Sequence, residues 1–124
     1  MEKYFLQLNN LFSQHDEIKL IYLFGSQAKN RTSPLSDYDF AVYFDPNINS
    51  ISLKEITLTL ISEISSIIKS EEIDLVILNQ PISPLLKFNI LKEGKLIYQQ
   101  SSYRLLVEPA IYNEYFDFKT FIQS

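Results

Sequence analysis

Two apolar stretches that follow one another in the sequence constrain the fold more than any other feature. They are "IKLIYLFG" at residues 18–25 and "DYDFAVYF" at residues 37–44, and both are rich in the branched and aromatic residues that favour buried strands. The second stretch also contains two acids, Asp37 and Asp39, on either side of Tyr38. Side chains alternate between the faces of a strand, so both carboxylates are expected on one side and the tyrosine on the other. A strand that the core needs therefore carries two charges on one side.

The remaining hydrophobic pattern predicts helices packed on a small sheet. Helices are expected over residues 3–14, over a short segment after Gly25, from Ser52 to about Lys69, over residues 84–93 and in a tail from Tyr103. Ser52 and Glu55 would form a capping box, and Gly94 would end the helix over 84–93 in the usual C′ role. In the tail, the helix is expected to restart at Pro109. The expected further strands cover residues 72–78 and 95–99. This order predicts an α/β or α+β fold, with a mixed sheet of about four strands flanked by helices.

Composition limits the classes of protein to which the chain can belong. Its 124 residues suit one domain, and no apolar run approaches the roughly 18 residues that span a bilayer. The N-terminus does not resemble a signal peptide, and without cysteine there is no disulfide, thiolate zinc site or cysteine nucleophile. We therefore expect a cytoplasmic protein with no membrane contact. The net charge of −4 and the scattered basic residues argue against direct nucleic-acid binding, although metal ions would still let such a protein bind a nucleotide.

The paired acids suggest a metal site. Two carboxylates this close repel one another unless a cation lies between them, and Mg²⁺ prefers hard oxygen ligands of this kind. Asp74, in "EIDLVIL", is the acid placed inside a later strand with apolar residues on both sides, so it would complete a site for two ions. We expect Asp37, Asp39 and Asp74 to be the catalytic and metal-binding residues. The alternative is that the first two are a strand-entry cap and a surface acid, and that Asp74 is an edge-strand or ion-paired acid.

Gly25 and Ser26 have the chemistry of a phosphate-binding turn. Glycine lets the backbone approach a phosphate, the N-terminus of the expected short helix presents free N–H groups, and the Ser26 hydroxyl adds a hydrogen bond. Lys29 would either add positive charge to the same triphosphate or be a solvated helix residue. His15, in "SQHDE", is expected to be an exposed loop residue without a catalytic part.

Gly25-Ser26, ten intervening residues and Asp37-Tyr38-Asp39 resemble the G-S-x10-D-x-D signature of the polymerase β-like nucleotidyltransferases. The small size, "PLLKFNILKEGKLIYQ" and the closing "YFDFKTF" further resemble the minimal nucleotidyltransferase (MNT) antitoxins that are encoded beside HEPN-domain toxins. The resemblance covers most of the chain from about residue 18 to the end. One departure is that the family often reads G-S-x-A-R-G, whereas Lys29 and Asn30 stand here for Arg and Gly, and lysine lacks the forked donors of arginine.

The resemblance implies a single minimal nucleotidyltransferase domain over residues 1–124, with residues 103–124 forming an aromatic helical tail. It implies that the protein transfers AMP from ATP to a tyrosine of a cognate HEPN RNase toxin, with two Mg²⁺ ions, and so neutralises the toxin in a heteromeric complex. The aromatic residues of the tail are either core residues or a face for a partner, and we expect mainly core residues.

The resemblance also implies roles for single residues. Asp37 and Asp39 would bind the metals, whereas Asp74 would hold the catalytic metal and take the proton of the attacking tyrosine hydroxyl. Gly25-Ser26, with Lys29, would hold the triphosphate. Two alternative functions remain open: an antitoxin that acts by occlusion alone, and a nucleotidyltransferase that modifies a small hydroxylated molecule.

Overall fold

The computed structural model of the chain describes residues 2–25 and 38–123. The elements of these ranges follow in the order η1 (Glu2–Tyr4), α1 (Phe5–Ser13), β1 (Ile18–Phe24), β2 (Tyr38–Phe44), α2 (Ser50–Ile68), β3 (Ile73–Ile77), α3 (Pro84–Glu93), β4 (Lys95–Gln99) and α4 (Tyr103–Gln123). The predicted helices and strands are thus present, except that the short helix expected after Gly25 lies outside the described residues. None of the described helices is long and apolar enough to cross a membrane.

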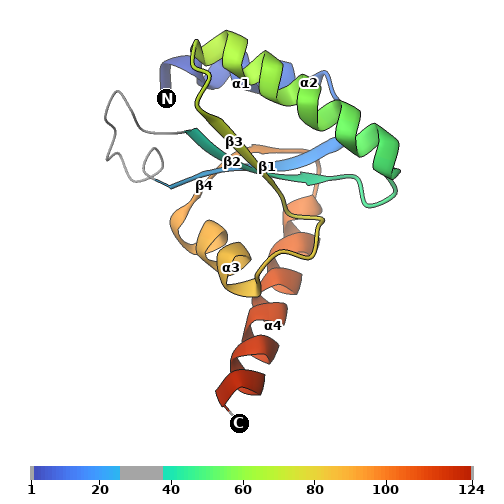
Figure 1. The fold of residues 1–124 in the computed structure, drawn as a ribbon, viewed down its shortest axis with the longest axis vertical. Coiled ribbons are helices and arrows are strands. Elements are labelled where there is room, and N and C mark those ends of the chain that lie inside the picture. The colour runs from blue at the N-terminus through green and yellow to red at the C-terminus, as the bar shows by residue number, and fades with distance from the viewer. Residues whose placement is uncertain (1, 26–37, 124) are drawn as a thin grey trace.

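The four strands form one mixed sheet in the order β3-β2-β1-β4. Strand β1 is antiparallel to both β2 and β4, whereas β2 and β3 are parallel and are joined by the crossover helix α2. Helices α1 and α2 cover one face of the sheet, and α3 and the first part of α4 cover the other (Figure 1). The predicted fold class, a mixed sheet of about four strands flanked by helices, is confirmed.

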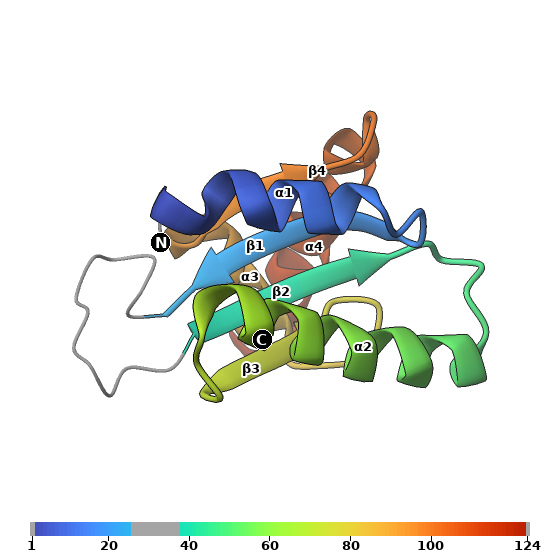
Figure 2. The same cartoon turned by 90° about the horizontal axis from the view of Figure 1, so that it is seen from above.

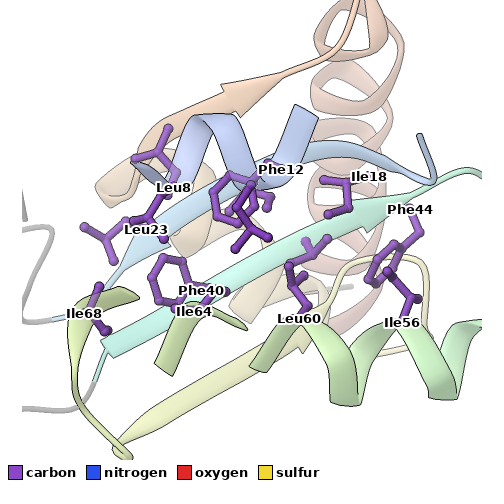
Figure 3. Packing of buried hydrophobic residues seen from close by; sticks show 14 residues of the cluster. Leu8, Phe12, Ile18, Leu23, Phe40, Phe44, Ile56, Leu60, Ile64 and Ile68 are labelled. Carbon is purple, nitrogen blue, oxygen red and sulfur yellow. The ribbon is translucent and has the colours of Figure 1, made fainter. Parts of the chain in front are cut away.

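The larger part of the core lies between the sheet and the helices α1 and α2. Phe12, Phe40, Phe44 and Leu60 are fully buried there, and Figure 3 shows side chains from α1, β1, β2 and α2 meeting in this layer. A second cluster lies on the opposite face, under α3 and α4; its buried members are Leu20, Tyr22, Ala41, Leu78, Ile90, Val107 and Ile111. Alternate residues of β2 therefore serve different layers, as the period of two predicts.

Helix α2 begins one turn earlier than expected. The side chain of Asn49 accepts a hydrogen bond from the backbone N–H of Ser52 at 2.8 Å, so Asn49 is the N-cap and Ser52 is already helical. The predicted capping box of Ser52 and Glu55 is therefore wrong. Asparagine is at least as good an N-cap as serine, and it lies directly after the turn at Asp45, so the helix starts at the first opportunity.

Gly94 ends α3, but not in the left-handed conformation that the C′ role implies. Its backbone is extended, with φ −80° and ψ 172°. A side chain there would collide with the carbonyl oxygens of Ile90, at 2.4 Å, and Leu23, at 3.0 Å. The glycine is needed because a side chain would meet the carbonyls of α3 and of the end of β1, and not for its freedom of rotation.

Helix α4 runs without interruption from Tyr103, so the predicted restart at Pro109 is wrong. Pro109 lacks only one N–H donor, and an exposed stretch of helix can leave the matching carbonyl to water. The C-terminal part of the helix extends away from the sheet (Figure 1), and Phe121 is 78% exposed. The expectation that the aromatic tail is mainly core is also wrong, although Phe88 of α3 stacks on Tyr115 with ring centroids 4.0 Å apart.

Candidate active site

Asp39 and Asp74 come together through the pairing of β2 and β3. The two strands are parallel, and Asp39 is the register partner of Asp74. Neighbouring strands lie about 4.8 Å apart and partners in register point to the same face, so the two carboxylates are adjacent. Asp39 is half-buried and Asp74 is exposed. Two acids that are far apart in the sequence therefore form one pair at the start of both strands.

The pair lies on the sheet face that α3 and α4 cover farther along the strands. Ala41, two residues after Asp39, belongs to the cluster under these helices, and Val76, two residues after Asp74, packs against the same cluster. Apolar packing thus ends where the carboxylates begin. Figure 2 shows this end of the sheet, at which β1 finishes and β2 starts. The acids accordingly lie at the rim of the core, where charges keep access to solvent.

Gly25 leaves room for the carboxylate of Asp39. It follows directly on Phe24, which is the register partner of Asp39 in the antiparallel pair of β1 and β2. Its φ of +75° lies in the left-handed region, and a Cβ atom there would be 2.3 Å from Oδ2 of Asp39. Both the conformation and the contact require glycine. The backbone turn after β1 is therefore packed directly against one of the acids.

Gly94 supports the same corner, and sequence reasoning missed this part of its role. A Cβ atom added to Gly94 would lie 3.0 Å from the carbonyl oxygen of Leu23 and 3.4 Å from Cβ of Phe24, the residue immediately before Gly25. Both glycines of the chain thus lie against the end of β1. That the chain has only two glycines could have pointed to a special role for Gly94. The pattern "KEGK", however, is also what an ordinary helix end looks like.

Ser26, Lys29 and Asp37 lie outside the described residues, so their predicted roles stay predictions. Within the ranges that the structure describes, no three His, Cys, Asp or Glu residues are close enough to bind one metal ion. The pair of Asp39 and Asp74 is therefore the described part of the predicted triad.

His15 is not part of this site, as expected, but it is not an exposed loop residue either. Its Nε2 atom lies 2.9 Å from Oε1 of Glu63 on α2, and its side chain is only 21% exposed. This contact ties the turn after α1 to α2, so the prediction of an exposed histidine is wrong.

The donor set of the pair suits a hard divalent cation. Carboxylate oxygens are the ligands that Mg²⁺ prefers, and two adjacent negative charges are stabilised when such an ion lies between them. The arrangement can thus support metal-assisted transfer of a phosphoryl or nucleotidyl group.

Comparison with known proteins gives a matching family model. The model described as "Polymerase beta, Nucleotidyltransferase" matches residues 7–103, which include all four strands. One curated relative, the protein adenylyltransferase MntA of Aphanizomenon flos-aquae (strain 2012/KM1/D3), is 32% identical over 89 residues. The match covers 67% of this chain and 58% of the relative, so the chain spans little more than half of that protein.

Solved structures with a similar fold come from toxin–antitoxin complexes. A chain of a toxin–antitoxin crystal structure with AMP-PNP superimposes with a TM-score of 0.73 at 24% identity, over 98% of this chain and 92% of that one. A chain of the complex of a tri-AMPylated Shewanella oneidensis HEPN toxin with MNT antitoxin gives a TM-score of 0.69 at 23% identity, over 98% and 92%. At these identities the likeness shows a shared fold.

Proposed function

The chain belongs to the polymerase β nucleotidyltransferase family, and from this premise we propose that it is an antitoxin that transfers AMP from ATP to a tyrosine of a HEPN-domain toxin. The observation that carries the proposal is the register pairing of Asp39 with Asp74 beside the glycine turn that ends β1. A nucleotidyltransferase needs acids at this place to hold the metal ions of the nucleotide.

Two similar proteins support the proposal that the acceptor is a protein. The curated relative is named a protein adenylyltransferase, and one protein of similar fold is found in complex with a HEPN toxin that carries AMP groups. A protein acceptor, which brings its own binding surface, fits these facts better than a small-molecule acceptor does. With ATP as the proposed donor, we propose a cytoplasmic location for the reaction.

The proposed reaction is an in-line displacement at the α-phosphorus of ATP. The tyrosine oxygen forms a new bond to this phosphorus, and the bond from the phosphorus to the oxygen that bridges to the β-phosphate breaks. Pyrophosphate leaves with that electron pair. The hydroxyl proton passes to the carboxylate of Asp74, the exposed member of the pair. Neutral tyrosine is thereby converted to an adenylylated tyrosine without any change in oxidation state.

The other residues of the site are proposed to bind the metal ions and the triphosphate and to orient them. We propose that Asp39, with Asp37 and Asp74, holds two Mg²⁺ ions, which would supply positive charge to the phosphates and to the attacking oxygen. Gly25, which has no side chain, leaves the space that the Asp39 carboxylate occupies. Ser26 and Lys29 are proposed to bind the triphosphate, as the motif predicts.

The test is AMP transfer to the toxin, followed by intact-mass spectrometry. The protein is incubated with ATP, Mg²⁺ and the HEPN protein proposed as its partner, and the toxin is expected to gain the mass of at least one AMP. Asp39→Asn and Asp74→Asn should each lower the transfer rate by about 100-fold or more, because each removes one charged metal ligand. A chelator should abolish transfer.

Two outcomes would overturn the proposal. A toxin that is inhibited in the complex but gains no mass would show an antitoxin that acts by occlusion. Transfer of AMP to a small hydroxylated molecule, with the toxin left unmodified, would show a different acceptor class.

A further inference from the structure

Strand β3 forms one edge of the sheet, and its backbone groups alternate between the sheet and the outside. The N–H of Tyr38 donates to the carbonyl of Glu72, and the N–H of Leu78 donates to the carbonyl of Val42, both at 2.8 Å. In a parallel pair, residues that bond the neighbour alternate with residues that point away from it. The even-numbered residues from Glu72 to Leu78 therefore point their backbone groups toward β2.

Ile73, Leu75 and Ile77 consequently direct their N–H and C=O groups outward. Within residues 2–25 and 38–123, no strand pairs with this outer edge. Such an edge is a ready template for another extended chain, since each outward donor and acceptor can be matched by a partner strand.

An apolar groove runs beside this edge, between α2 and β3. It has a volume of about 400 Å³ and is lined by Leu53, Thr57, Leu58 and Ile77, with polar residues at its ends. Leu58, one of the residues that line the groove, is 69% exposed. An apolar side chain from an added strand would fill the groove and cover Leu58.

The register of the sheet fixes what an added strand would present. Its residue opposite Asp74 would point to the same face as the two carboxylates, since partners in register share a face. Its residue opposite Ile77 would point to the other face, where the groove lies. These two positions are three residues apart, or about 10 Å along a strand.

We propose that an extended segment of the protein acceptor docks along the outer edge of β3 as a fifth strand, with the hydroxyl residue to be modified opposite Asp74 and an apolar residue three positions away in the groove. This inference rests on the proposed function, because it explains how a protein acceptor reaches Asp74. It adds a docking mode and a sequence requirement for the acceptor, namely a tyrosine three residues from an apolar side chain in an extended segment.

A second copy of this chain fits the edge less well than an acceptor does. Its own edge segment, "IDLVI" at Ile73–Ile77, has no hydroxyl group to place beside Asp74. Pairing of two such edges would also bring two Asp74 carboxylates, and so two negative charges, near one another. The continuity of the edge with the candidate active site therefore favours the acceptor.

Backbone hydrogen exchange tests the docking mode, and the strand contains its own control. In the ¹⁵N-labelled protein bound to the unlabelled HEPN protein, the outward amides of Ile73, Leu75 and Ile77 should exchange at least about tenfold more slowly than in the free protein. The amides of Asp74 and Val76 already bond β2 and should change little. Unchanged exchange at the outward amides in a formed complex would overturn the docking mode.

Matched variants on α2 test the groove. Leu58→Glu places a charge in the groove and should weaken binding of the HEPN protein about tenfold, since it prevents burial of an apolar side chain there. Ile51→Glu is the control, because Ile51 is also exposed, at 71%, on the same helix but does not line the groove. Equal affinities of the two variants would contradict the proposal.

The two proposals can fail separately. If AMP is transferred while the outward amides of β3 stay unprotected, the reaction stands and the docking mode is wrong. If these amides are protected but the toxin gains no mass, the docking mode stands and the protein acts by occlusion. A rise in oligomeric state, with protection of the same amides in the protein alone, would show instead that the edge joins two copies of this chain.

Discussion

At the scale of single residues, Oδ2 of Asp39 lies where a side chain on Gly25 would begin. Gly25→Ala should therefore move the carboxylate and lower AMP transfer by about 100-fold or more, while the left-handed φ and the clash with the carboxylate together lower the free energy of unfolding by about 2–3 kcal/mol. Steady-state kinetics and urea unfolding measure the two effects.

A double-mutant cycle separates the contact from the backbone strain. In the Asp39→Ala background, the atoms closest to the new Cβ are gone and only Cβ of residue 39 remains, at 3.5 Å. The destabilisation by Gly25→Ala should then shrink to the cost of the φ angle alone, about 1 kcal/mol. Equal destabilisation in both backgrounds would show that the carboxylate does not meet residue 25.

The pairing of Asp39 with Asp74 could be predicted from the sequence because it depends on strand periodicity and on one charge inside each apolar stretch. The fit of Gly25 to the Asp39 carboxylate could not, since it depends on how closely two strand ends approach in three dimensions. Sequence reasoning gave this glycine a role toward phosphate, and the structure gives it a role toward an acid of the chain itself.

At the scale of elements, the start of α2 shows how two good caps compete. Asn49→Ala should lower the free energy of unfolding by about 1 kcal/mol, because the N–H of Ser52 then loses its acceptor. Ser52→Ala should change it by less than about 0.5 kcal/mol, since Ser52 is a half-buried residue already inside the helix and is not its N-cap. Thermal or urea unfolding compares them, and a larger effect of the serine would restore the predicted capping box.

Local sequence patterns predicted which helices and strands exist more reliably than they predicted where these elements end. The bounds of α3 and β4 were predicted as observed, because Pro84 and Gly94 mark them in the sequence. For α4, Pro109 was a misleading marker, since packing of Val107 and Ile111 on the sheet holds the helix on both sides of the proline. Tertiary contacts outweighed the local signal there.

At the scale of the whole molecule, one hydrogen bond joins the sheet to the C-terminal helix. The phenol of Tyr22 on β1 donates to Oε2 of Glu108 on α4 at 2.6 Å. Burial raises the pKa of Tyr22 above its ordinary value of about 10, and the hydrogen bond to Glu108 raises it further. The folded protein therefore keeps this proton under conditions in which the unfolded chain releases it.

This difference predicts a loss of stability at high pH. Below pH 10 both states hold the proton, whereas above it the unfolded state is favoured by ionisation, so the free energy of unfolding should fall as pH rises. Between pH 10 and 11 the fall should be steeper than in Tyr22→Phe by up to about 1.4 kcal/mol per pH unit. Parallel curves for the two proteins in urea unfolding would contradict the shift.

Asp74 is the only charged residue between Ile73 and Ile77, and it lies on an open strand edge. Proteins prevent such edges from joining those of other molecules by placing charges on them, so this carboxylate also protects the protein from aggregation. Asp74→Asn should accordingly scatter light at a lower concentration on warming than Asp39→Asn, whose strand lies inside the sheet. A chain that had lost catalysis would thus still be under selection to keep this acid, because without the charge the free protein would be less soluble.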